Sequence, residues 1–319
     1  MNTTTFFPIS KVDLIKAICA IVIVVHHSSF YLPDSVFASV FRACGYLPVG
    51  IFLFISGYGL LTSLYAKENY LKSFLAKRMT KILVPAIISL LIYLPFVDGN
   101  IIIAEFFEGK LPFSHYWYIV IIVTMYLLFF IVFSLIKSKR KAVGVTMMLL
   151  ICYVIVSMAM GIGSYWYYTI GTYGGGILLA LIANEPKYKS LFQNILSNRK
   201  RISIVLFMIF VITTALKHLR IPLGIDFPGF GVALTLTCSL VLPLFLCFTK
   251  DEVAVNKSWK FVSGVSYEIY LIHNLIVYGY NKLLGIHSIF DILAILSASV
   301  MVAFIIMKFS KAAIRVIVK

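Results

Sequence analysis

The sequence predicts an all-α integral membrane protein, a polytopic helical bundle of about ten transmembrane helices with both termini in the cytoplasm. Three observations predict this class. The 319 residues are 61% hydrophobic and 13% charged, whereas soluble domains carry about 25% charged residues. The mean hydropathy is +0.99. Apolar runs of membrane-spanning length recur along the chain, and basic residues gather in every second segment between them.

The apolar runs define the expected helices in chain order. They lie at about 12–31, 46–66, 82–98, 117–136, 142–160, 164–183, 202–216, 229–248, 264–283 and 290–307. We expect the first run to be a retained span, because no basic segment precedes it and no small-residue cleavage site follows it. No linker or clear repeat divides the chain, so the prediction is a single transmembrane domain over residues 1–319.

The net charge of +16 is unevenly distributed. Seventeen Lys and Arg residues fall between spans two and three, four and five, six and seven, and eight and nine, whereas the other connections and their edges hold five. Positively charged loops stay on the cytoplasmic side, so these four loops are predicted to be inside. This alternation indicates topology and contact with anionic membrane lipids, and it argues against nucleic-acid binding.

The five cysteines show no metal-binding or redox spacing, and four of them lie in expected spans. We therefore expect neither a disulfide nor a metal site.

Ionisable residues in the first span are the strongest functional signal, because such groups are costly inside a bilayer. Eleven residues separate Lys16 from His27, which is about 20° past three helical turns and a rise of roughly 16 Å. Asp13, Lys16 and His27 thus follow one face, while His26 points about 100° away from His27. Alternatively, Lys16 extends to the inner headgroups and the histidines make ordinary helix contacts.

Two further segments follow, one inside the second span and one at the cytoplasmic end of the third. Ser56 and Gly57 interrupt the second span, where small residues permit close helix approach. Arg78 and Lys81 are three residues apart and share a face at the start of span three. That pair is suitable for binding the phosphates of a cytosolic ligand. The alternative is that both residues only belong to the positive charge of the cytoplasmic side.

Aromatic and acidic residues mark the outer connection between spans three and four. It is the longest outer loop and contains Glu105, Glu108 and His115, with Trp117 at the entry to the next span. A Trp at this depth is often a membrane-interface residue.

Polar residues also follow one side of span nine, in the segment SYEIYLIHN at residues 266–274. It carries Tyr267, Glu268, Tyr270 and His273. So many hydrogen-bonding groups argue against a lipid-facing side, because such groups are costly in hydrocarbon. A packing histidine bonded to another helix is the alternative for His273.

Four of these segments together resemble acyltransferase family 3. The motifs are KVDLIKAICAIVIVVHH, VGIFLFISGYGLL, FLAKRMTKILVP and SYEIYLIH, and the resemblance covers about residues 11–280. The ten-residue gap in the first motif selects His27. Lys16 and Lys81 stand where the family has arginine, which retains the charge but loses the bidentate geometry of a guanidinium.

The resemblance implies a membrane O-acyltransferase that moves acetyl from cytosolic acetyl-CoA to a hydroxyl of an extracytoplasmic or lipid-linked carbohydrate. It implies a bacterial plasma-membrane protein with acyl-CoA as co-substrate and no metal. The roles it assigns are catalysis for His27, Lys16 and Asp13; cofactor binding for Arg78, Lys81, Ser56, Tyr267 and His273; and substrate binding for Glu105, Glu108, His115 and Trp117.

Two choices stay open at this point. His27 acts either as a base during direct transfer or as an acyl carrier. A glycan or small-molecule transporter, or a flippase, is the alternative class. A transporter usually shows inverted repeats, and we find no such symmetry in the sequence.

Overall fold

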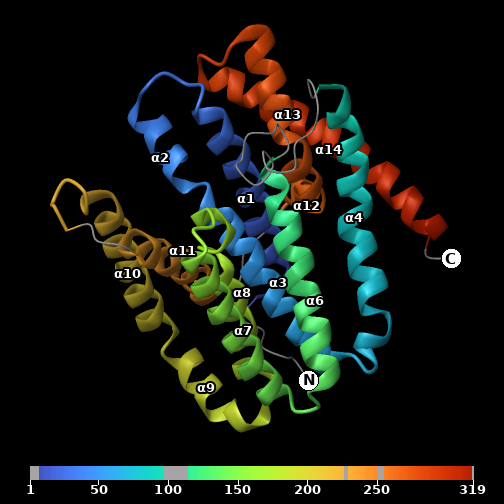
Figure 1. The fold of residues 1–319 in the computed structure, drawn as a ribbon, viewed down its shortest axis with the longest axis vertical. Coiled ribbons are helices and arrows are strands. Elements are labelled where there is room, and N and C mark those ends of the chain that lie inside the picture. The colour runs from blue at the N-terminus through green and yellow to red at the C-terminus, as the bar shows by residue number, and fades with distance from the viewer. Residues whose placement is uncertain (1–6, 97–113, 226–228, 250–254, 318–319) are drawn as a thin grey trace. The chain divides into compact units, whose positions relative to one another are not determined.

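The computed structural model describes residues 7–96, 114–225, 229–249 and 255–317, and in these ranges the chain forms helices and no strand (Figure 1). The α-helices are α1 (Ile9–Ser29), α2 (Val36–Cys44), α3 (Tyr46–Ala66), α4 (Phe74–Tyr93), α6 (Trp117–Leu135), α7 (Lys139–Ala159), α8 (Ile170–Asn184), α9 (Lys189–Ser197), α10 (Arg199–Leu219), α11 (Phe230–Phe248), α12 (Lys257–Gly264), α13 (Ser266–Leu284) and α14 (Ile289–Ile317). Short 3₁₀ segments are η1 (Tyr70–Ser73), η2 (Leu94–Phe96), η3 (Ser114–Tyr116), η4 (Ser164–Trp166) and η5 (Pro186–Tyr188).

The all-helical, multi-span prediction is confirmed. Each expected span shares most of its residues with one helix, namely α1, α3, α4, α6, α7, α8, α10, α11, α13 or α14. The third expected span (82–98) ends outside the described residues, and the sixth (164–183) begins in η4. Among the described residues, seven helical stretches are long and apolar enough to cross a membrane, and they include α3, α4, α6, α7, α10, α11 and α14. A total of ten spans, and the cytoplasmic placement of both termini, stay predictions.

Several boundaries differ from those expected. α4 begins at Phe74 and α10 at Arg199, so each helix takes in basic residues that were expected in the preceding loop. Charged side chains end an apolar run without ending the backbone hydrogen-bonding of a helix. Between α7 and α8 the chain turns at Gly161, whose φ of 65° is left-handed, and α8 then has only 15 residues.

The chain divides into two compact units, each made of several segments. The first comprises Met1–Val12, Val49–Lys72 and Leu128–Val253, and the second comprises Asp13–Pro48, Ser73–Leu127 and Ala254–Lys319. A single transmembrane domain over residues 1–319 stays a prediction.

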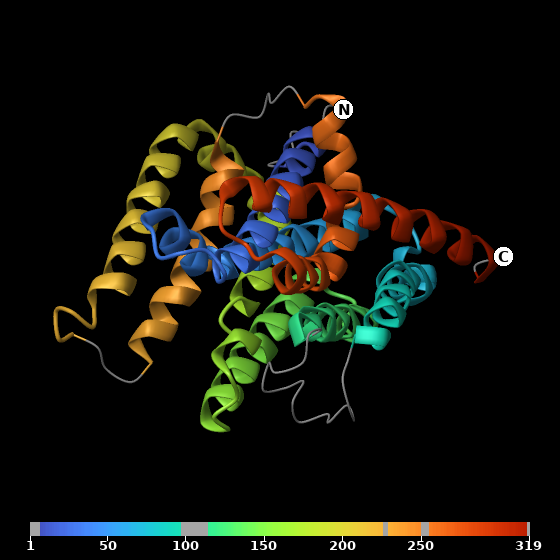
Figure 2. The ribbon, with the colours of Figure 1, turned by 90° about the horizontal axis from the view of Figure 1, so that it is seen from above.

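In the first unit, α10 packs along α11, α11 against α8, and α8 against α7; Figure 2 shows α10 beside α11. The C-terminal end of α11 is held by two cations. Lys11 Nζ donates to the carbonyls of Cys247 (3.2 Å) and Thr249 (2.9 Å). Arg199 Nε donates to the Phe248 carbonyl at 3.0 Å. Positive groups at a helix C-terminus also complement its dipole.

Helices α3 and α8 approach through glycines. A Cβ on Gly57 would lie 2.3 Å from the carbonyl oxygen of Tyr173, and one on Gly176 would lie 2.1 Å from that of Phe54. Both neighbours are backbone atoms, so only glycine permits this separation. The expectation that the Ser56-Gly57 pair allows close helix approach is therefore confirmed at Gly57.

In the second unit, α13 packs against both α14 and α4, and α14 also packs against α4 (Figure 1). Tyr267 on α13 donates its hydroxyl hydrogen to the Ile82 carbonyl of α4 at 2.9 Å. Asn256 caps the neighbouring α12 by accepting from the Trp259 amide at 3.0 Å. The polar residues of α13 consequently face protein neighbours along this packed side.

Candidate functional site

Three imidazoles from distant parts of the sequence lie together in the second unit. His27 comes from the end of α1, His115 from η3 and His273 from α13. The ring centroids of His27 and His273 are 4.8 Å apart, and those of His115 and His273 are 5.1 Å apart. We call these three residues the imidazole cluster.

The tautomer of His273 follows from its hydrogen bonds. Its Nδ1 lies 2.7 Å from the carbonyl oxygen of Tyr270 and 3.2 Å from that of Ile269. A carbonyl oxygen can only accept, so Nδ1 carries the hydrogen, and Nε2 of the neutral ring offers a lone pair. The side chain is fully buried, and Nε2 has no hydrogen-bond partner among the described residues.

His115 is oriented by the backbone of α13. Its Nε2 donates to the Leu271 carbonyl at 3.1 Å, and its own carbonyl accepts from the Tyr270 hydroxyl. One turn further along α13, the Leu275 amide donates to the Tyr93 hydroxyl at 3.0 Å. Side chains from two other elements thus bind backbone groups of α13 beside His273 and fix the position of η3.

His26 and His27 occupy different surroundings. His26 Nδ1 donates to the Phe41 carbonyl of α2 at 2.8 Å, and its ring lies so close to Gly45 that a Cβ there would be 2.2 Å from Nε2. His26 therefore links α1 to α2. His27 is half-buried, and no described residue forms a hydrogen bond with its ring.

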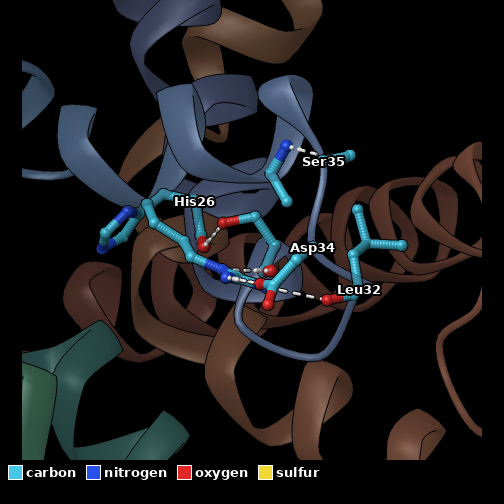
Figure 3. Close-up of polar contacts among 7 residues, drawn as sticks. His26, Leu32, Asp34 and Ser35 are labelled. Carbon is cyan, nitrogen blue, oxygen red and sulfur yellow. Dashed lines mark hydrogen bonds and ion pairs between the residues drawn. The ribbon is translucent and has the colours of Figure 1, made fainter.

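A polar turn after α1 supports this end of the helix (Figure 3). Arg42 donates to the carboxylate of Asp34 (2.7 Å), the carbonyl of Leu32 (2.7 Å) and the carbonyl of Ser29 (2.9 Å). In Figure 3 the ring of His26 lies apart from the contacts at Asp34 and Leu32. The turn thus holds the chain that connects α1 to α2 through Arg42, and the His26 carbonyl adds a bond by accepting from the Ser29 hydroxyl at 2.6 Å.

The other end of α1 carries the charged residues. Asp13 Oδ1 accepts from the Ser263 hydroxyl of α12 at 2.9 Å. Lys16 is half-buried and interacts electrostatically with Asp13 and with Glu268 of α13. Because the rise from Lys16 to His27 is about 16 Å, these charges lie well away from the imidazole cluster.

The pair predicted to bind phosphates lies on α4. Arg78 is half-buried, with its guanidinium 5.7 Å from the centroid of the Tyr126 ring, and Lys81 is exposed. Tyr267 bonds the next backbone carbonyl, that of Ile82. Tyr267 thus joins α13 to α4 one residue after Lys81, whereas Arg78 lies against Tyr126 of α6.

The remaining predicted residues are placed as follows. Trp117 begins α6, with its ring centroid 6.3 Å from that of Tyr118. Ser56 lies on α3, in the first unit. Glu105 and Glu108 lie outside the described residues. His115, predicted from the outer loop to bind substrate, belongs to the imidazole cluster.

Two residues that form hydrogen bonds with α13 or with Asp13 were not predicted from the sequence. Tyr93 lies in an ordinary apolar run, and Ser263 lies in a short helix that no apolar pattern predicts. Nothing in their local sequence marks them. Within the described parts of the chain, no group of three or more His, Cys, Asp or Glu residues has an arrangement that could hold a metal ion.

Apolar helices of spanning length define a multi-pass membrane protein. Two of the three rings in the imidazole cluster, those of His115 and His273, are buried. Residues 9–308 match the acyltransferase domain family, and the chain therefore belongs to acyltransferase family 3. The resemblance read from the four motifs is confirmed, and the protein is an acyltransferase. No curated protein and no solved structure matches the chain.

Proposed function

We propose that the protein transfers an acetyl group from cytosolic acetyl-CoA to a hydroxyl of an extracytoplasmic or lipid-linked carbohydrate. The observation that carries this proposal is the position of His27, whose ring lies 4.8 Å from that of His273 in the imidazole cluster. Family membership supports acyl transfer as the reaction class and argues against the alternative of a transporter or flippase.

A sugar hydroxyl is a poor nucleophile at neutral pH, so the reaction needs a base. In the proposed step, the hydroxyl oxygen attacks the thioester carbonyl carbon and its proton passes to a ring nitrogen of His27. The carbon–sulfur bond then breaks, and the CoA thiolate takes that proton. His27 as a transient acyl carrier is the second route, in which the imidazole itself attacks the thioester.

The donor would bind from the cytoplasmic side. The phosphates of CoA cannot enter hydrocarbon without a large cost, so they would stay with cations near the membrane surface. Arg78 and Lys81 are the cations proposed for them. Asp13 and Lys16 would shape the inner end of the route toward His27, since about 16 Å of helix separates Lys16 from that ring.

The acceptor would approach from the outer side, near the loop with Glu105 and Glu108 and the start of α6 at Trp117. Carboxylates accept hydrogen bonds from sugar hydroxyls, and aromatic rings are suitable for sugar faces. The proposed location is a cell membrane in the bacterial envelope, with the polar headgroups of membrane lipids around the basic loops.

The direct test is incubation of membranes containing the protein with radiolabelled acetyl-CoA. The proposal expects label in a glycan or lipid-linked sugar and release of one CoA thiol per acetyl transferred. Substrate flux across the membrane with no requirement for CoA would instead assign the protein to the transporter class.

We expect Arg78→Ala to raise the KM for acetyl-CoA by about tenfold or more, because hydrogen bonds to charged groups contribute about 1.5–3 kcal/mol. The fall in kcat should be smaller, since the phosphates lie away from the reacting carbon. Steady-state kinetics on purified protein measure both. Lys77→Ala removes an exposed neighbouring cation of α4 and serves as the control. A fall in kcat without a change in KM would assign Arg78 to the chemical step.

A further inference from the structure

The Nε2 atom of His273 is the most informative polar atom in the second unit. The side chain is fully buried, and Nε2 has no hydrogen-bond partner among the described residues. Buried polar atoms in native proteins are nearly always hydrogen-bonded, so an exception of this kind requires an explanation. A bound substrate that supplies a hydrogen would satisfy the atom.

The hydrogen bond at Nδ1 determines whether a partner of Nε2 must donate or accept a hydrogen. Nδ1 donates to the Tyr270 carbonyl at 2.7 Å, so the neutral ring can only accept at Nε2. Protonation would allow Nε2 to donate, but a buried charge needs a partner, and no described carboxylate forms an ion pair or hydrogen bond with this ring. The partner must therefore carry an O–H or N–H group.

A thioester carbonyl or a phosphate cannot be the partner of Nε2, because both groups only accept hydrogen bonds. An acyl acceptor, by contrast, brings hydroxyl groups. The neighbouring rings also favour the acyl acceptor as the partner. The ring of His27, the proposed base, is 4.8 Å from that of His273. The ring of His115 is 5.1 Å away and comes from η3, which follows the connection predicted to be outside.

We infer that His273 binds the acyl acceptor and that its Nε2 accepts a hydrogen bond from one of the acceptor's hydroxyl groups. This inference rests on the proposed function and deepens it. It moves His273 from the acyl-CoA side, where the family resemblance placed it, to the acceptor side. It also gives the reacting molecule a requirement, namely a hydroxyl that can donate to an imidazole beside the base.

The first arm of the test needs no substrate. Protein labelled with ¹⁵N-histidine and purified in detergent is studied by NMR, and the His273 signals are assigned by their loss in His273→Asn. We expect a hydrogen on Nδ1 and none on Nε2. A hydrogen on Nε2, in either the other tautomer or the imidazolium form, would overturn the inference.

The second arm compares His273→Asn with His273→Gln in the transfer assay. The asparagine amide can keep the bond to the Tyr270 carbonyl but does not extend to the Nε2 position, whereas the glutamine amide oxygen extends that far and accepts. We expect Asn to lower kcat/KM for the acceptor about tenfold or more, and Gln to retain several-fold more activity than Asn.

The affinity for acetyl-CoA is measured on the same variants by titration calorimetry. Both should bind acetyl-CoA within about twofold of the unsubstituted protein, whereas Arg78→Ala should not. A loss of acetyl-CoA affinity as large as the loss of transfer would place His273 against an amide N–H of the pantetheine arm and overturn the inference. Equal activity of His273→Asn and the unsubstituted protein would do the same.

These outcomes separate the inference from the proposed function. An unsubstituted protein that transfers no acetyl contradicts the proposed function, and the inference then fails with it, whatever the tautomer is. Acetyl transfer that survives the His273 substitutions contradicts the inference alone.

Discussion

Replacement of His27 by asparagine is expected to lower kcat for acyl transfer by about 10²–10⁴-fold, because positioned general bases typically contribute that much. An asparagine amide cannot take up the proton of the attacking hydroxyl, and it cannot carry an acyl group. Binding of acetyl-CoA should change little, since Arg78 and Lys81 on α4 are the residues proposed to hold it. The measurement is the initial rate of label transfer from acetyl-CoA at saturating donor.

His26→Asn is the matched control, since it makes the same chemical change at the adjacent position. The asparagine amide can replace the His26 Nδ1 donor to the Phe41 carbonyl, so the link between α1 and α2 should persist. We expect activity within a few-fold of the unsubstituted protein. If His26→Asn loses activity and His27→Asn keeps it, the proton acceptor has been assigned to the wrong residue.

Mass spectrometry of the protein, quenched after mixing with acetyl-CoA alone, separates the two routes open to His27. Direct transfer predicts unmodified protein, whereas an acyl-enzyme predicts an acetyl adduct that disappears on addition of acceptor.

The second large effect is expected at the contact between α3 and α8. Gly57→Ala or Gly176→Ala would bring a methyl group to within 2.3 or 2.1 Å of a backbone carbonyl oxygen. A side chain could rotate away from such a contact, but a helix backbone must shift as a whole. Overpacking of a well-packed interior costs about 1–3 kcal/mol and occasionally more. We expect the upper end here and a marked fall in the yield of folded protein.

Gly59→Ala provides the comparison on the same helix, because a Cβ there would meet no atom within 4 Å. Alanine is favoured over glycine inside a helix by about 1 kcal/mol, so this variant should be as stable as the unsubstituted protein or more so. Thermal unfolding in detergent, followed by size-exclusion chromatography, measures all three. Equal melting temperatures for Gly57→Ala and Gly59→Ala would contradict the close approach of α3 and α8.

The sequence predicts the long helices well because crossing a bilayer requires long apolar runs, and each expected segment overlaps one helix for most of its length. It does not predict α2, α9 and α12, which have nine, nine and eight residues. Helices this short fall below the length that an apolar span requires, so the hydropathy pattern does not reveal them.

The candidate site, too, is predicted from the sequence only in part. Helical geometry predicts that Lys16 and His27 share a face of α1, and the motif resemblance selects His27 and His273. Neither argument brings His115 to His273, because the contact depends on how η3 meets α13. The Tyr93 hydroxyl is a further example, since its bond to the Leu275 amide joins residues 182 positions apart.

The polar contacts at the start of α1 have a consequence for biogenesis. Lys11 bonds carbonyls 236 and 238 residues later in the chain, and Asp13 bonds Ser263, 250 residues later. At a synthesis rate of about 5–20 residues per second, roughly 10–50 s pass before these partners leave the ribosome. A nascent chain in the translocon must therefore keep a lysine and an aspartate in water or against other proteins during that interval. Messages truncated before residue 247 should accordingly yield chains that cellular quality control removes.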